Sequence, residues 1–313
     1  MGPAPSVVIR EVGPRDGLQA EAPMPPVERA RLVNALADAG CKRIEAVSFV
    51  SEGAVPSMAG ARKVLAALAL GDGVSVSALV PNETGARLAL EAPVGASRRR
   101  LDELTVTVAA SPAYNMLNVR RSIDESLGEI ARIAKRARGV VPAVRIDAVV
   151  SCAFGSPYEG DADPDEVAAL CTRLLEAGAS ALTLADTTGM ATPRVLVELL
   201  DALEAARIDR VLLGMHFHET RGTALLNAYA ALGAGIFRFD TSLGGLGGSP
   251  FADGSGGNLS TEDFVALLDD LGLRTGIDLE VLLGASQLLQ SLVGHELSSR
   301  VAAAGPRTRL VPS

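Results

Sequence analysis

The sequence predicts an α/β protein with a (β/α)₈ (TIM) barrel, and three observations lead to that fold class. Eight short runs rich in β-branched residues alternate with amphipathic segments rich in Ala and Leu. The runs are almost continuously apolar, which is typical of parallel strands covered on both faces. They are evenly spaced, and no GxGxxG follows the first run, which favours a closed barrel over a doubly wound open sheet. We therefore expect a single domain over residues 1–313, with the barrel at about 6–275.

The elements follow in chain order. Helical patterns such as 26–40 and 163–179 end at Gly40 and Gly178, as helices with a C-terminal glycine do. Asp163 followed by Pro164 predicts a helix start. After about residue 275, the apolar pattern predicts extra C-terminal helices at about 276–303 that pack on the barrel. The expected strands lie at 6–13, 43–50, 74–80, 103–111, 143–152, 181–189, 210–218 and 236–244.

Composition excludes several classes of function. A net charge of −8, 3% aromatic residues and no Trp argue against a nucleic-acid partner. The chain has neither a signal-peptide pattern nor 18 consecutive uncharged apolar residues, so we expect no membrane partner. Three cysteines, Cys41, Cys152 and Cys171, form no CxxC pair and are interpreted as core thiols of a cytoplasmic protein.

Unusual polar residues fall where strands are expected to end. In such barrels the chemistry lies at the carboxyl ends of the strands, so we expect these residues to converge on one mouth. They are Glu11, Arg15, Asp16, Gln19, Glu45, Ser48, Asp186, His216, His218 and, after the eighth strand, Asn258.

His216 and His218 are two of only three histidines in the chain. Residues i and i+2 of a strand point to the same face, so both imidazoles can bind one metal ion. The alternative is a pair of core histidines with local hydrogen bonds, and the spacing favours the metal. Oxygens of Asp16 and Asn258 would complete a set that suits Mg²⁺, Mn²⁺ or Zn²⁺, and the lack of thiolates favours the harder ions.

Three charged residues have two interpretations each. Arg15 either belongs to a surface turn or directs its guanidinium at developing negative charge. Glu45 lies in an apolar strand, so its carboxylate must be paired or functional, and it can orient Arg15 or a histidine. Asp186 either caps the following helix or acts in the site.

A glycine-rich segment, 244–264, follows the eighth strand. It is either a flexible connector ending in a capping box at Ser260 and Asp263 or a lid that excludes water. The absence of a following lysine argues against a phosphate-binding loop, and the lid is favoured.

These motifs together carry a family resemblance. EVGPRDGLQ, IEAVSFVS, SPYEG, LADTTGMATP, HFHET and GLGGSPFADGSGGNLSTEDF, in this order between about residues 7 and 300, resemble the 3-hydroxy-3-methylglutaryl-CoA lyases of the DRE-TIM metallolyase superfamily. The resemblance implies a (β/α)₈ barrel, a divalent cation (Mg²⁺ or Mn²⁺), an acyl-CoA substrate, a role in leucine catabolism and often a homodimer.

The resemblance also implies residue roles. Its metal ligands match Asp16, His216, His218 and Asn258. Its catalytic arginine and acids match Arg15, Glu45 and Asp186. Together with Arg15, the residues expected to line the substrate site are Gln19, Ser48, Asn118, Tyr158 and Thr183.

The implied reaction is a retro-Claisen cleavage of a tertiary 3-hydroxyacyl-CoA to acetyl-CoA and a ketoacid or ketone. The cation lowers the pKa of the C3 hydroxyl, and His216 or Asp16 removes its proton. Arg15 then stabilises the enolate oxygen. An acid must finally protonate the enolate carbon.

Two departures from the family's motifs bear on the choice of substrate. The family's lid reads GGCP, with a cysteine credited with proton transfer, whereas this chain has Ser249 there, and a hydroxyl is a far weaker acid than a thiol. HFHETRG also replaces the family's HxHDTYG, which introduces Glu219 and Arg221. A sister lyase with another acyl group, a Claisen synthase, a pyruvate-releasing aldolase and a metal-binding relic therefore stay open, although Leu18 in RDGLQ favours the lyase over the synthase.

Overall fold

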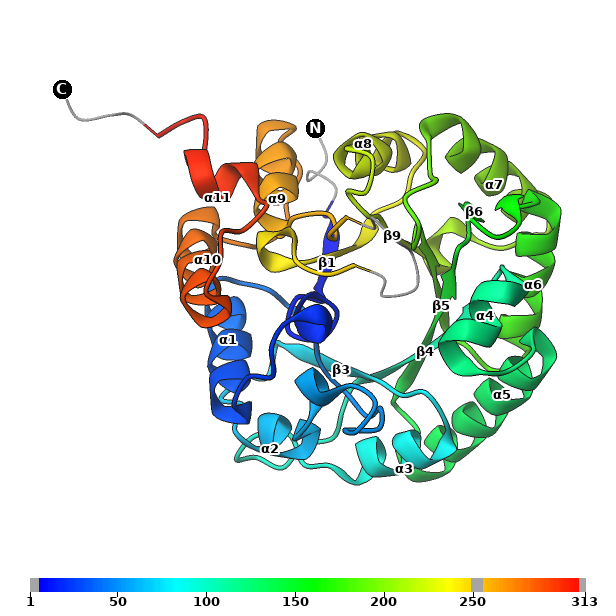
Figure 1. The fold of residues 1–313 in the computed structure, drawn as a ribbon, viewed down its shortest axis with the longest axis horizontal. Coiled ribbons are helices and arrows are strands. Elements are labelled where there is room, and N and C mark those ends of the chain that lie inside the picture. Colours follow the sequence, from blue (N-terminus) through cyan, green and yellow to red (C-terminus); the bar gives the residue numbers. More distant parts are fainter. Residues whose placement is uncertain (1–5, 249–255, 310–313) are drawn as a thin grey trace.

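The computed structural model describes residues 6–248 and 256–309, and its centre is a closed barrel of eight parallel strands (Figure 1). Around the barrel each strand pairs with its neighbours in the order β1-β10-β9-β8-β5-β4-β3-β2. All eight predicted strands are present, which confirms the predicted fold class. They are β1 (Val8–Glu11), β2 (Arg43–Ser48), β3 (Ser75–Leu79), β4 (Glu103–Ala109), β5 (Arg145–Ser151), β8 (Ala181–Ala185), β9 (Leu213–His216) and β10 (Arg238–Thr241).

Helices surround the barrel, and Figure 1 shows them as an outer ring. The predicted C-terminal helices are α10 and α11, and α10 packs against α1. The helices are α1 (Pro26–Asp38), α2 (Ala61–Ala66), α3 (Glu83–Glu91), α4 (Pro112–Val119), α5 (Ile123–Val140), α6 (Pro164–Glu176), α7 (Pro193–Ala205), α8 (Ala224–Gly233), α9 (Thr261–Asp270), α10 (Leu279–Val293) and α11 (Arg300–Ala304). Within the described ranges, no helix has the length and apolar character needed to cross a lipid bilayer.

The helix boundaries follow the local sequence signals. Asp163 caps α6 by accepting a hydrogen bond from the Asp165 amide, and Gly40 and Gly178 adopt φ values of +99° and +106° just after α1 and α6. A Cβ at Gly40 would lie 2.3 Å from the carbonyl oxygen of Gly276, so this position also needs glycine for the close approach of the C-terminal segment.

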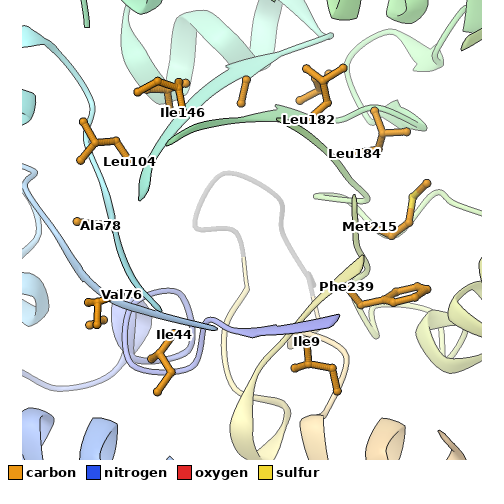
Figure 2. Packing of buried hydrophobic residues seen from close by; sticks show 14 of the residues in the cluster. Ile9, Ile44, Val76, Ala78, Leu104, Ile146, Leu182, Leu184, Met215 and Phe239 are labelled. Carbon is orange, nitrogen blue, oxygen red and sulfur yellow. The ribbon is translucent and has the colours of Figure 1, made fainter. Parts of the chain in front are cut away.

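The main core lies between the barrel and the helices. Alternate strand residues such as Ile44, Leu104, Ile146, Leu184 and Phe239 are buried and point away from the barrel axis (Figure 2). The residues between them therefore point into the barrel, where the sequence places charged and hydroxyl side chains. This alternation directs the functional groups inward.

The barrel interior holds a buried ion network. Arg10 lies at its centre, 2.6 Å from Asp147, 2.7 Å from Asp240 and 3.1 Å from Glu103. All four side chains are at most about one-twentieth exposed. The mouth of the barrel is the end at which the carboxyl ends of the strands lie. The ion network occupies the interior below this mouth.

Some local features differ from the sequence prediction. A short hairpin, β6 (Gly155–Ser156) and β7 (Gly160–Asp161), follows β5 and was not predicted. The seventh barrel strand ends at His216, and His218 instead forms an isolated bridge with Asn258. The capping box is half formed: Ser260 caps α9 by accepting from the Asp263 amide, whereas the Asp263 carboxylate accepts from Ser299 of the segment before α11.

Candidate metal and active site

The loop after β1 carries Arg15 and Asp16 to the mouth of the barrel. Its turn is closed by the Val12 carbonyl, which accepts hydrogen bonds from the Arg15 and Asp16 amides at 3.0 and 2.7 Å. Buried Glu11 ties the loop to the end of β10 by accepting from the Gly13 and Leu243 amides at 2.7 and 2.9 Å. The loop is therefore fixed by hydrogen bonds at both ends.

The two histidines come together as their spacing predicts. The Nε2 atoms of His216 and His218 lie 3.1 Å apart, and both side chains are buried. His216 is the last residue of β9, and the bridge to Asn258 holds His218 just beyond it.

Their hydrogen-bond partners fix which ring nitrogens carry protons. His216 Nδ1 faces a carboxylate oxygen of Asp240 at 3.2 Å, and His218 Nδ1 faces the Gly256 carbonyl at 3.1 Å. A carbonyl or an ionised carboxylate only accepts hydrogen bonds, so each Nδ1 must be the donor. When both rings are neutral, the two Nε2 lone pairs face each other at hydrogen-bond distance with no proton between them. Burial lowers the pKa of His216, but the hydrogen bond to Asp240 and the charge of Asp16 outweigh it and raise that pKa, so a proton on His216 can fill this position. A shared cation can replace that proton, so the residues present fit a metal ion.

Oxygen donors lie beside the two rings. Asp16, His216 and His218 offer ligand atoms that all lie within 4.8 Å of one another. Asn258 is also present, since its Nδ2 donates to Asp16 at 2.7 Å. Its buried Oδ1 has no hydrogen-bond partner among the described residues, so this amide oxygen is available to bind a cation.

Electrostatics keep Asp16 and His218 in the protonation states that metal binding needs. Burial would raise the pKa of Asp16, but Arg15 and the two histidines outweigh it and bring the pKa to about 2. Burial and the neighbouring His216 lower the pKa of His218 to about 4. Near neutral pH, Asp16 is therefore anionic and His218 neutral, as ligands must be.

Arg15 is held between two carboxylates. Its Nε donates to Glu45 at 2.5 Å, and its Nη1 bonds Asp16. Arg15 is only 8% exposed, which rules out the surface-turn interpretation. Within the described part of the chain, Nη2 of Arg15 makes no hydrogen bond, and Oε1 of Glu45 is buried without a partner. The pair thus keeps one donor and one acceptor available at the mouth.

Asp186 follows β8 and is buried. One oxygen accepts from the Ala191 amide at 2.8 Å, and the other has no partner in the described ranges. Burial raises its pKa to about 7. The suggestion that Asp186 caps the next helix is wrong, because Thr192 caps α7 by accepting from the Val195 amide. A catalytic role for Asp186 stays a prediction.

The predicted substrate residues are distributed unevenly. Ser48 is buried at the end of β2, and its hydroxyl has no partner among residues 6–248 and 256–309. Gln19 lies on the Arg15 loop, whereas Asn118 and Tyr158 are exposed on α4 and the β6–β7 hairpin. Thr183 is buried, and its hydroxyl donates to Asp147 at 2.8 Å in the ion network.

Ser249 and most of the glycine-rich lid candidate lie outside the described residues. Arg221 donates to the carbonyls of Thr188 and Gly189, so the structure ties it to the loop after β8. Cys152 is buried, and burial raises its pKa to about 12, which agrees with a core thiol.

Two residues next to the site, Asp240 and Arg10, were missed by the sequence analysis. Both are charged residues within apolar strand runs, which is the same signal that singled out Glu45. Asp240 accepts from Arg10 and lies against His216, so it connects the ion network to the histidine pair.

Opposite the histidines the mouth has a neutral wall. We use this name for Leu79, Thr107 and Val149, the upper inward positions of β3, β4 and β5. All three are partly exposed inside a closed barrel, although their outward neighbours are buried. The charged groups of the mouth therefore come from β1, β2, β8 and β9 and the segments after them, whereas β3, β4 and β5 present uncharged side chains.

Comparison with known proteins gives matches over nearly the whole chain. The HMGL-like family model matches residues 6–289. A 3-hydroxy-3-isohexenylglutaryl-CoA/hydroxymethylglutaryl-CoA lyase of Pseudomonas aeruginosa is 41% identical over 95% of this chain and 96% of its own length. An (R)-citramalyl-CoA lyase of Chloroflexus aurantiacus is 39% identical over 96% and 95%.

Solved structures agree with this result. An HMG-CoA lyase from Acinetobacter baumannii, in complex with coenzyme A and 3-methylmalate, superposes with a TM-score of 0.91 at 37% identity and covers 98% of both chains.

Proposed function

This chain belongs to the HMGL-like family and is a carbon–carbon lyase, and we propose that it cleaves a tertiary 3-hydroxyacyl-CoA to acetyl-CoA and a ketoacid or ketone with the help of a divalent cation. One observation carries the cation dependence: the two imidazoles direct their Nε2 atoms at each other, 3.1 Å apart, beside an anionic Asp16.

The proposed cation ligands are Asp16, His216, His218 and Asn258. Nitrogen and oxygen donors without thiolate fit Mg²⁺ or Mn²⁺. When bound, the cation supplies positive charge that polarises the C3 hydroxyl and the neighbouring acyl oxygen of the substrate.

The protein groups at the mouth carry out the proton transfer and stabilise the enolate. The C3 hydroxyl proton passes to His216 or Asp16, two members of the ligand cluster that can act as bases. Cleavage of the C2–C3 bond leaves a thioester enolate, and Arg15 stabilises its oxygen with the Nη2 group that lacks a described partner. Glu45 holds the guanidinium in place from β2, because its Oε2 accepts from Nε.

The substituent on C3 is proposed to lie against the neutral wall. Leu79, Thr107 and Val149 offer apolar groups and a hydroxyl but no charge, so the wall suits an alkyl or alkenyl branch. The relatives named above act on different acyl groups, which agrees with a site that varies here.

A second candidate is a sister lyase whose substrate differs from hydroxymethylglutaryl-CoA. It is favoured by Ser249, which replaces the cysteine that the family resemblance assigns to proton transfer. In this case another acid protonates the enolate carbon, and the preferred acyl group differs. We also expect a homodimer, which light scattering on the purified protein tests.

The test is a cleavage assay with Mg²⁺ or Mn²⁺ on hydroxymethylglutaryl-CoA, citramalyl-CoA and homologues with longer C3 branches, with acetyl-CoA as the measured product. Wild-type protein should cleave at least one thioester, and Arg15→Met should lose about 10²–10³-fold in kcat. Release of free thiol from acetyl-CoA plus a 2-oxoacid would instead indicate a synthase. Metal binding without cleavage of any thioester would contradict the lyase proposal.

A further inference from the structure

We propose that Asp240 and Arg10 form a positioning pair that fixes the His216 ring so that its Nε2 lone pair faces the divalent cation. The inference rests on the metal site of the proposed function. It assigns a role to two buried residues that contact neither the expected substrate nor the expected cation.

Strand register places the pair. In the barrel, Arg10 of β1 is the register partner of Asp240 of β10, and Asp240 is in turn the register partner of His216 of β9. The three side chains therefore form a row across adjacent strands at one level of the interior. Since parallel strands cannot slip by one residue without reversing their inward faces, the row is fixed by the fold.

Asp240 contacts the ring directly. Its Oδ2 lies 3.2 Å from His216 Nδ1, and the two residues are 5% and 7% exposed. Little water can therefore compete for either group, and among the described residues this carboxylate is the hydrogen-bond partner of Nδ1.

Arg10 keeps that carboxylate ionised and immobile. Its Nε and Nη2 donate to Oδ1 and Oδ2 of Asp240 at 2.8 and 2.7 Å, which is a bidentate contact. Glu103 and Asp147 hold the other side of the guanidinium at 3.1 and 2.6 Å. Because two carboxylates share this side, loss of the charge of one of them should leave the bidentate contact of Arg10 with Asp240 in place.

The chemical consequence follows from donor and acceptor roles. An ionised Asp240 can only accept, so the His216 proton must lie on Nδ1 and the Nε2 lone pair is free for a cation. A carboxylate behind a metal-binding histidine fixes the tautomer and makes the imidazole a stronger ligand. An amide at position 240 could donate to Nδ1 and thereby favour the tautomer whose Nε2 is protonated.

The first test compares Asp240→Asn with Asp147→Asn in Mn²⁺ binding, followed by the electron paramagnetic resonance signal of free Mn²⁺. Asp147 contacts the same arginine but makes no contact with His216 among the described residues, so its variant is the matched control. We expect Asp240→Asn to weaken Mn²⁺ binding by about 10- to 100-fold, and Asp147→Asn to change it by no more than about threefold. Wild-type affinity in folded Asp240→Asn, or equal losses in both variants, would overturn the proposal.

The second test needs no substitution in the network. The chain has only three histidines, so ¹⁵N-labelled imidazoles give a simple spectrum, and His295→Gln assigns the exposed one. In metal-free wild-type protein at alkaline pH, His216 should carry its proton on Nδ1, and a proton on Nε2 would refute the positioning pair.

Neither readout requires turnover. If the protein cleaves no acyl-CoA but passes both tests, the proposed reaction is wrong and the positioning pair stands. If it cleaves acyl-CoA and both tests fail, the proposed reaction stands and the positioning pair is wrong.

Discussion

Substituting Glu45 by Gln tests whether the buried Arg15–Glu45 pair serves catalysis or only stability. The side chain of Glu45 is fully buried and that of Arg15 is 10% exposed, with 2.5 Å between Nε and Oε2. Gln keeps the shape and one acceptor, while Asp16 still compensates the Arg15 charge. The loss is therefore the difference between a charged and a neutral hydrogen bond, about 1–2 kcal/mol in the free energy of unfolding.

The Glu45→Gln protein should also lose activity while it is still folded. Without the anionic partner, the guanidinium is less well fixed against the enolate oxygen, and we expect kcat/KM to fall by about 10- to 100-fold. Urea denaturation measures stability, and acetyl-CoA release at saturating Mg²⁺ measures activity.

Glu103→Gln is the matched control for this experiment. Glu103 is equally buried and pairs with Arg10 at 3.1 Å and with Arg43 at 2.5 Å, but it lies deeper in the interior, away from the mouth. It should lose at least as much stability as Glu45→Gln, with kcat/KM within about threefold of wild type. If Glu45→Gln kept its activity while losing stability, the assignment of Glu45 to holding Arg15 for catalysis would be refuted.

Four further predictions concern single residues. Burial raises the pKa of Glu11 from 4.5 to about 7, so the stabilisation of its protonated form is lost as pH rises through that window. As the pH rises from 4.5 to 7, wild-type protein should therefore lose up to about 3 kcal/mol in its free energy of unfolding relative to Glu11→Gln. A difference between the two proteins that does not change with pH would contradict this prediction. Asp163→Ala should cost about 1 kcal/mol in urea denaturation by uncapping α6 and leave activity unchanged; an activity loss would show that the helix end affects the site. Asp16→Asn should abolish measurable Mn²⁺ binding in titration calorimetry, and retained tight binding would remove Asp16 from the ligand set. Ser249→Cys should raise hydroxymethylglutaryl-CoA cleavage if the native acyl group is a different one, and unchanged relative rates across the thioester panel would argue against a sister activity.

Most of the fold prediction came from the periodicity of apolar residues and from the residues that mark helix ends. Alternation of apolar runs with helical patterns located all eight barrel strands, and Asp163, Gly40 and Gly178 marked helix ends correctly. These signals are local, because a cap or a φ value above zero depends on a few neighbouring residues. The β6–β7 hairpin was missed because its strands span only two residues each, too short for a periodic signal.

The sequence by itself determined that His216 and His218 face one way, since a strand has a period of two residues. It could not determine which groups surround them. Asn258 and Asp16 lie 242 positions apart yet form a 2.7 Å hydrogen bond, and the row of Arg10, Asp240 and His216 exists only through the register of three strands. Such contacts depend on barrel closure, which is a property of the whole chain and not of any segment. Local physics thus set the elements and their inward faces, and tertiary structure decided which charges meet.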